Sequence, residues 1–250
     1  MRSYAIGDIH GHLDKLIEIH RRIDADRAET GDFDAPIVHL GDNPDRGPNV
    51  PGVLEFLIAG QKRNEPWIFI RGNHDRMMWL FLQDQPKLDP LRHDLHWLNA
   101  NIGGRATLAA YGVDVSDGRD VNDIHAAARA AVPAHHLTFL TGLQNSLHRG
   151  RVFFCHAGVR PGVAFDAQVE DDLVWIRPEF LNDKRDHGAL VVHGHTAIDK
   201  VTHAGNRLNI DTGAAYGRAL SAVVIEGDDV FELTDQGRVQ VHATPVDDYV

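Results

Sequence analysis

The sequence predicts an α/β fold in which helices cover a parallel β-sheet. In the N-terminal half, short apolar runs alternate with segments whose apolar residues recur every three or four positions. This β-α-β-α-β order is typical of a parallel sheet. Further apolar runs follow residue 151, and glycine, aspartate and asparagine separate the last three. That pattern indicates an antiparallel meander near the C-terminus.

The elements of the N-terminal half follow from their residue patterns. Strands are expected at 3–6, 37–40 and 67–70, because each is a short apolar run that stops at a glycine-containing turn. Helices are expected at 13–23 and at 53–58, and Pro48 and Pro51 stand at the entrance of the second helix.

The remaining elements divide into a helical region and a strand region. Residues 76–150 are expected to form a mostly helical insertion, with helices near 77–82, 91–101 and 124–132 and a loop over 84–90. Strands are expected at 152–155, 190–192, 208–210, 220–225 and 230–233.

Composition excludes several classes of protein. There are 25 Lys and Arg against 36 Asp and Glu, a net charge of −11, which argues against binding a nucleic acid through bulk positive charge. The single cysteine, Cys155, excludes an intrachain disulfide and a multi-cysteine metal site. No apolar run approaches 18 residues, and Asp8 and His10 lie too near the start for a signal peptide. We therefore expect a cytoplasmic protein without a membrane or nucleic-acid partner.

Five short segments share one layout, in which an apolar run leads directly into small residues and a side chain that can bind metal. They lie at 7–11, 41–47, 72–75, 156–158 and 193–196. In open α/β sheets, ligands bind beyond the carboxyl ends of the strands. The side chains expected around one crevice are Asp8, His10, Asp42, Asn73, His156 and His195.

These six ligands are carboxylates, imidazoles and an amide, which suit divalent ions such as Mn²⁺, Fe²⁺ or Zn²⁺. They are too many for one catalytic zinc, which usually has three protein ligands. Two ions about 3.5–4 Å apart and bridged by one carboxylate would use them all. Such a pair lowers the pKa of a bridging water and stabilises an in-line displacement at phosphorus.

The five segments, in this order, resemble the calcineurin-like metallophosphoesterase superfamily. Asp45-Arg46-Gly47 and the stretch at 71–74 are similar to its phosphoprotein phosphatase branch, especially to short bacterial and phage-type members, and to the related symmetrical diadenosine tetraphosphatases. The resemblance implies a four-layer αββα sandwich of two mixed β-sheets flanked by helices. It further implies one domain, 1–250, with a helical cap insertion at about 76–150 beside the site.

The resemblance also implies a role for each site residue. Asp8 and His10 would hold the first ion, Asp42 would bridge both ions, and Asn73, His156 and His195 would hold the second. His74, steadied by Asp45, would protonate the leaving oxygen, and a general acid contributes roughly 10²–10⁴-fold to the rate. Arg46 and Arg177 would bind the phosphoryl oxygens, with Arg71 assisting.

The sequence departs from the pattern of this branch at three positions. Asn43 replaces a usual aromatic residue and would remove an aromatic wall near the site. Pro44 stiffens the same loop. Asp75 replaces a usual Glu with a shorter acid of the same charge, which should spare the chemistry.

The activity implied by the resemblance is hydrolysis of phosphomonoesters, with in-line attack by a hydroxide that bridges two ions. Mn²⁺ is the expected metal, with Fe or Zn as alternatives. The first hypothesis for the substrate is a phosphoserine or phosphothreonine protein; the alternative is a dinucleoside polyphosphate such as diadenosine tetraphosphate, or another small phosphoester. An open groove would suit a peptide, and an aromatic-lined pocket would suit adenine. A non-catalytic metal-binding scaffold is disfavoured by the His74–Asp45 pair, and the oligomeric state is left open.

Other conspicuous residues have structural interpretations. His39 is expected to be a hydrogen-bonded core histidine, and His193 to support the site or lie in the core. His135 and His136 are not assigned to a metal site, because adjacent residues rarely face the same way. The acidic runs at 170–172 and 247–248 are expected to be solvated faces.

Overall fold

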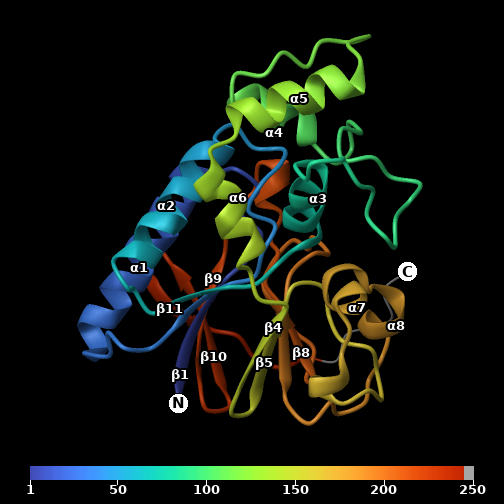
Figure 1. The fold of residues 1–250 in the computed structure, drawn as a ribbon. Helices are drawn as coiled ribbons and strands as arrows, with labels where there is room; N and C mark the ends of the chain where they lie inside the picture. Colours follow the sequence, from blue (N-terminus) through green and yellow to red (C-terminus); the bar gives the residue numbers. More distant parts are fainter. Residues whose placement is uncertain (245–250) are drawn as a thin grey trace.

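The computed structural model describes residues 1–244, and in it two β-sheets pack face to face with helices on both outer faces (Figure 1). The first sheet has the order β11-β10-β9-β1-β2-β3 and the second β4-β5-β6-β8-β7. This arrangement confirms the four-layer fold expected from the resemblance.

The strands of the first sheet are β1 (Arg2–Ile6), β2 (Ile37–His39), β3 (Trp67–Phe69), β9 (Ala222–Glu226), β10 (Asp229–Thr234) and β11 (Gly237–Gln240). Those of the second are β4 (Ser146–Arg149), β5 (Val152–Cys155), β6 (Leu190–His193), β7 (Thr202–His203) and β8 (Arg207–Asn209).

The parallel part of the first sheet is the one predicted from the N-terminal half. β1 pairs in parallel with β2, and β2 with β3. The expected C-terminal meander is corrected in one respect: β8 pairs in parallel with β6 in the second sheet, and the meander consists of β9, β10 and β11. An apolar run of this length carries no signal for which of two sheets it joins.

Two long helices, α1 (Leu13–Thr30) and α2 (Val50–Lys62), pack on the outer face of the first sheet. Their buried apolar side chains join those of β1 and β2 in one core cluster. Asn49 caps α2 by accepting a hydrogen bond of 2.9 Å from the Gly52 N–H. These helices therefore cover the outer face of β1 and β2.

The middle of the chain contains α3 (Asn73–Phe81), α4 (Gly104–Ala110), α5 (Val121–Ala131) and α6 (Ala134–Thr141). The helix predicted at 91–101 was wrong, because this segment forms turns. Side chains there compete for backbone N–H groups: Asp89 accepts from Leu91, and Asn99 from Asn101. Such local bonds favour turns over helix.

A second apolar cluster fills the space between the two sheets, and a third joins the outer face of the second sheet to α7 (Glu170–Trp175) and α8 (Pro178–Leu181). The chain also has 3₁₀ turns at Phe165–Ala167 and Ala214–Tyr216. Within residues 1–244, no helix has the length and apolar character needed to cross a bilayer.

The carboxylates at 170–172, expected to form a solvated face, are partly exposed, and each also pairs with an arginine. Glu170 pairs with Arg71 at 3.2 Å, Asp171 with Arg76 at 2.6 Å, and Asp172 with the Arg160 guanidinium. The first turn of α7 is therefore tied to the segment that enters α3. The other acidic run, 247–248, lies outside the described residues.

Candidate active site

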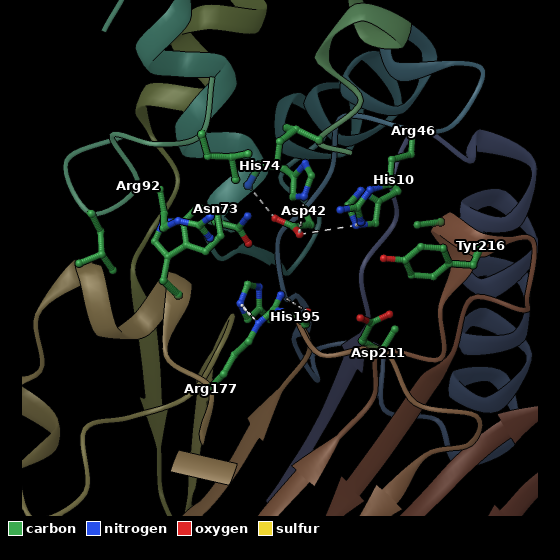
Figure 2. Close-up of a pocket in the computed structure, with 16 residues that line it drawn as sticks. His10, Asp42, Arg46, Asn73, His74, Arg92, Arg177, His195, Asp211 and Tyr216 are labelled. Carbon is green, nitrogen blue, oxygen red and sulfur yellow. Dashed lines mark hydrogen bonds and ion pairs between the residues drawn. The ribbon is translucent and has the colours of Figure 1, made fainter. Parts of the chain in front are cut away.

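A cavity of about 270 Å³ lies where strands of both sheets end (Figure 2). β1, β2, β3, β5 and β6 each lead directly into one of the five segments singled out in the sequence. Because parallel strands end at a common edge, residues scattered over the chain meet there. The predicted site residues that line the cavity are His10, Asp42, Arg46, Asn73, His74, Arg177 and His195. Asp8, Asp45 and His156 join them by hydrogen bonds.

The backbone is strained where the site residues sit. Six non-glycine residues within 1–244 have positive φ, and five of them are predicted site residues. Such conformations cost roughly 1–3 kcal/mol each and persist only where the surrounding structure enforces them. The five are His10, Asp42, Asp45, Arg46 and His195, with φ between 47° and 74°.

Two glycines in the same segments allow close approach to carboxylates. A Cβ at Gly72 would collide with Oδ1 of Asp42, and a Cβ at Gly194 would collide with Oδ1 of Asp8. Only glycine fits at either position without moving a carboxylate.

One group of potential metal ligands consists of His10, Asp42 and His74. The His10 Nδ1–H donates to the Pro44 carbonyl at 3.0 Å, which leaves Nε2 facing Asp42 Oδ2 at 3.5 Å. A backbone carbonyl on the other ring nitrogen is the usual arrangement behind a metal-binding histidine.

The second group consists of Asp42, His156 and His195. The His156 Nδ1–H donates to the Leu40 carbonyl at 2.9 Å, so Nε2 faces the site. That Nε2 lies 3.4 Å from Asp42 Oδ1 and 3.0 Å from Asn73 Oδ1. Asp42 therefore belongs to both groups, and Figure 2 shows it between them.

The buried charges of the site fit bound cations. Oδ1 of Asp8 is buried and has no hydrogen-bond partner among the described residues. Burial and the neighbouring Asp211 raise the pKa of Asp8 well above its usual range. Burial opposes the charge of Asp42, but the nearby His156 and His74 outweigh it and hold the pKa of Asp42 well below its usual range. Divalent ions would neutralise these crowded carboxylates.

The protonation states of two of the ligand histidines, His10 and His195, also fit bound metal, whereas the charges of Asp42 and Asp8 outweigh burial and raise the pKa of His156 to about 10. Burial, aided by the positive charge of His74 for His10 and of His156 for His195, lowers the pKa of both well below the usual range. Both are therefore neutral near pH 7, the form that ligates metal.

His74 and Asp45 form a hydrogen-bonded pair beside the first group. The His74 ring Nδ1 lies 2.7 Å from Oδ2 of Asp45. Asp45 is fully buried and also accepts hydrogen bonds from Trp97 Nε1 at 2.9 Å and Thr107 Oγ1 at 2.6 Å. The carboxylate is thus fixed by three donors, and it orients the imidazole with Nε2 toward Asp42, 3.9 Å away.

Two of the three predicted phosphate-binding arginines lie at the site. Arg46 donates from Nη1 to His10 Nε2 at 3.0 Å, and Arg177 from Nε to His195 Nε2 at 2.9 Å. The structure does not bring Arg71 to the cavity. Its guanidinium instead donates to Glu170 at 3.2 Å and to the Thr141 carbonyl at 3.1 Å.

Sequence reasoning missed several residues that line the cavity. Arg92 comes from the turn segment before α4, Trp175 from α7 and Tyr216 from a 3₁₀ turn. Arg92 lies over the Trp175 ring at 5.4 Å and Arg46 over the Tyr216 ring at 5.5 Å. None of the three stands in a motif, so no sequence signal marked them.

Asp75 was also missed as a residue that shapes the site. It is buried and accepts from the N–H groups of Gly72, Asp42 and Asn43 at 2.8–3.2 Å. Burial and the charge of Asp42 raise the pKa of Asp75 to about 6. The Asn43 side chain also donates to Asp75 at 2.9 Å, so Asn43 stabilises the loop.

His193 lies outside both groups of potential ligands. β6 ends at His193, and the positive φ of His195 breaks the strand alternation between them. The buried His193 ring packs edge-on against Phe180, 5.1 Å between ring centroids, and its Nδ1 lies 3.1 Å from the Gly194 carbonyl. His39 is likewise fully buried, and its Nε2 lies 3.0 Å from that of His20.

Comparison with known proteins agrees with this site. Residues 1–223 match the family model for calcineurin-like phosphoesterases. The chain is 23% identical to the bis(5'-nucleosyl)-tetraphosphatase PrpE [asymmetrical] of Bacillus velezensis, over 86% of each chain, and 23% identical to the protein of that name from Halalkalibacterium halodurans, over 89% of each. The crystal structure of a cold-active protein-tyrosine phosphatase from a psychrophilic Shewanella species shares the fold. Its TM-score is 0.61 at 15% identity, over 96% of this chain and 80% of that one.

The family uses two divalent metal ions, and the two His/Asp groups described above could hold them. The chain therefore belongs to the calcineurin-like phosphoesterase family and is a metal-dependent phosphoester hydrolase.

Proposed function

We propose that this chain hydrolyses the phosphoanhydride chain of dinucleoside polyphosphates such as diadenosine tetraphosphate. The observation that carries the proposal is the lining of the cavity. Three arginines and two aromatic rings surround the potential metal ligands: Arg46, Arg92, Arg177, Trp175 and Tyr216.

The arginines suit a chain of several phosphates. Arg46 and Arg177 lie beside the two groups of metal ligands, where a phosphoryl group would react. Arg92 lines the same cavity from a different segment, where it pairs with Asp94 through Nε and Nη2, and it would meet charge beyond the reacting phosphate. Guanidinium groups bind phosphate oxygens in a bidentate manner, so additional phosphates favour additional arginines.

The aromatic and aliphatic lining suits a nucleobase. Tyr216 lines the cavity and is 65% exposed, so its ring is accessible to a ligand. Trp175 offers an indole Nε1–H that is buried without a partner among the described residues. Leu91, Leu95 and Ile102 complete an apolar wall. A base could stack on such rings, and stacking contributes about 1–3 kcal/mol per base in nucleic-acid complexes.

The names of the relatives favour the same substrate over the phosphoprotein of the first hypothesis. The relatives named as tetraphosphatases match this chain along 86–89% of their length. An aromatic lining is also the feature expected for adenine, and Trp175 and Tyr216 provide it here.

We propose the site roles that the resemblance implies. His10 and Asp42 of the first group would hold one ion together with Asp8, whose buried Oδ1 lacks a partner among the described residues, and His74 of that group would stay free of metal. Asp42, Asn73, His156 and His195 would hold the other ion. Two bound divalent ions supply positive charge and lower the pKa of a water between them. Arg46, Arg177 and Arg92 would orient the phosphate chain and stabilise charge that develops on its oxygens.

His74 would donate the proton that the leaving oxygen requires. Its Nε2 is the ring nitrogen not used by Asp45, and it faces the cavity. The Asp45 carboxylate at Nδ1 fixes the ring so that Nε2 is the nitrogen presented to the substrate. We propose that residues 76–150 act as a cap, since Trp97 and Thr107 from this region hold Asp45 in place.

The test is a direct comparison of substrates. Purified protein supplied with Mn²⁺ is incubated with diadenosine tetraphosphate and, separately, with a phosphoserine peptide, and products are separated by anion exchange. We expect kcat/KM for the dinucleotide to exceed that for the peptide at least tenfold, with AMP and ATP as the products. A preference for the peptide would overturn the proposal.

Variants of the lining sharpen this test. Tyr216→Ala should raise KM for diadenosine tetraphosphate and leave p-nitrophenyl phosphate turnover nearly unchanged, because only the dinucleotide carries a base. Val239→Ala, at another exposed apolar residue outside the cavity, is the control. Equal losses on both substrates in Tyr216→Ala would remove Tyr216 from base recognition.

A further inference from the structure

We infer that Glu55, His135 and His136 form a zinc site separate from the catalytic centre. One ligand atom from each residue lies within 4.8 Å of the others. Glu55 comes from α2, and the two histidines come from the first turn of α6. None of the three lines the catalytic cavity.

The two histidines face the same carboxylate despite being adjacent in sequence. His135 Nε2 lies 2.6 Å and His136 Nε2 3.0 Å from Oε1 of Glu55. Their rings are 4.5 Å apart and inclined at 76°, so the two Nε2 atoms converge from different directions. The expectation that adjacent histidines face apart is wrong here, because the start of α6 lies against α2 (Figure 1).

The His136 ring is held in the manner of a metal ligand. It is almost fully buried, and its Nδ1 lies 2.6 Å from the Tyr111 hydroxyl. In this structure the Nε2–H donates to Glu55 and Nδ1 accepts from the Tyr111 hydroxyl. A zinc ion at Nε2 would replace that hydrogen, and an Nδ1–H would then donate to the Tyr111 oxygen. A fixed partner on the second nitrogen is what orients ligating histidines in known sites.

The ligand set identifies the class of ion. Two imidazoles and one carboxylate make up the three-ligand set of many zinc sites with an open fourth position. Neutral imidazoles bind Zn²⁺ more strongly than Mn²⁺ in the usual order of affinities. Glu55 and His135 are about half exposed, so water can occupy the fourth position.

A bound zinc would link α2, which lies on the outer face of the first sheet, to α6, the last helix of the 76–150 region. Since the ligands come together only in the folded chain, zinc would stabilise the folded state. His136 also connects through Tyr111 to the end of α4, so the link reaches the helix that carries Thr107.

The test counts zinc ions in the full chain. Protein stripped with a chelator is titrated with Zn²⁺ against a chromophoric competitor. We expect wild type to bind one more equivalent of Zn²⁺ than either His135→Gln or Glu55→Gln. Tyr111→Phe should still bind this additional Zn²⁺, but with an affinity about 10–100-fold lower. Wild type should also gain more thermal stability from Zn²⁺ than the two ligand variants.

His148→Gln, at an exposed histidine of β4, is the matched control and should bind as many equivalents as wild type. Phosphoesterase turnover should be unchanged in His135→Gln, which separates this site from the catalytic pair. Equal zinc stoichiometry in wild type, His135→Gln and Glu55→Gln would overturn the inference. If His135→Gln does not fold, Glu55→Gln replaces it in the zinc count, because Glu55 is exposed and its substitution should not disturb the core.

Discussion

Asp42 shows how single residues are specialised at this site. Its backbone has φ of 50°, and Oδ1 accepts the His74 N–H at the start of α3 at 2.9 Å. The same carboxylate faces His10 with one oxygen and His156 with the other. Few other residues could adopt this backbone conformation and also face both histidines with a carboxylate oxygen.

His74→Asn tests the proton donor. The variant should retain metal but lose about 10²–10⁴-fold in kcat on an alkyl phosphate, whose leaving alkoxide needs a proton. The loss should be smaller on p-nitrophenyl phosphate and on diadenosine tetraphosphate, because nitrophenolate and phosphate leave more readily. Steady-state kinetics on the three substrates measure this. Equal losses on all three would exclude His74 as the acid.

The buried pair His20 and His39 predicts a pH dependence of stability. Burial and the charge of His39 lower the pKa of His20 to about 2, and burial lowers the pKa of His39 to about 4. The unfolded chain therefore binds protons below about pH 6.5 that the folded chain does not, and the free energy of unfolding falls with falling pH. Each histidine contributes a slope of at most about 1.4 kcal/mol per pH unit.

Urea unfolding between pH 5 and 7 measures this slope. His20→Gln retains hydrogen-bonding groups but cannot titrate. The slope of the free energy of unfolding against pH should therefore decrease by up to about 1.4 kcal/mol per pH unit, the contribution of one histidine. His148→Gln replaces an exposed histidine and should leave the slope unchanged. If His20→Gln retained the wild-type slope, His20 would not be a neutral buried group.

At the scale of elements, the turn segment before α4 and α4 itself complete the site from outside the sheets. The buried Arg76 of α3 makes paired hydrogen bonds of 2.7 and 2.8 Å to Asp89, which anchors the segment carrying Arg92. Trp97 and Thr107 hold Asp45. Residues 76–150 thereby contribute part of the cavity wall and hold Asp45, the partner of the proposed general acid His74.

Thr107→Val tests this contribution. The change preserves shape but removes a hydroxyl that donates to Asp45 and accepts from its N–H at 3.0 Å. One hydrogen bond to a charged group contributes roughly 1.5–3 kcal/mol, so we expect kcat on an alkyl phosphate to fall about tenfold with KM nearly constant. Thr138→Val, at an exposed threonine of α6, is the matched control. A change in KM alone would show that Thr107 acts on binding instead.

Over the whole molecule, the site residues that could be predicted from the sequence are those that directly follow a strand. Asp8, Asp42 and Asn73 follow β1, β2 and β3, and parallel strands necessarily bring such residues to one edge. Arg92 could not be predicted, because turns formed by local side-chain bonds carry it to the cavity. Arg71 has the right residue type beside the right motif, yet Glu170 of a distant helix binds it. Long-range partners of this kind leave no pattern in the sequence.

Removal of metal should affect the whole fold. Asp8, Asp42 and Asp211 lie buried near one another, and without cations their charges repel. We expect a chelator to abolish turnover and lower Tm by several degrees, with both restored by Mn²⁺. Calorimetry with and without the chelator measures this. An unchanged Tm together with full activity would contradict a metal-dependent site.

The proposed role of Asp42 is to hold two ions at once, and counting metal ions in Asp42→Asn is the sharpest test of that role. Elemental analysis of active wild-type protein should find two divalent ions per chain, and Asp42→Asn should lose metal and at least about a hundredfold in turnover. Asp228→Asn, at a carboxylate 79% exposed, should match wild type. Full metal content and full turnover in Asp42→Asn would show that Asp42 does not bridge the two ions.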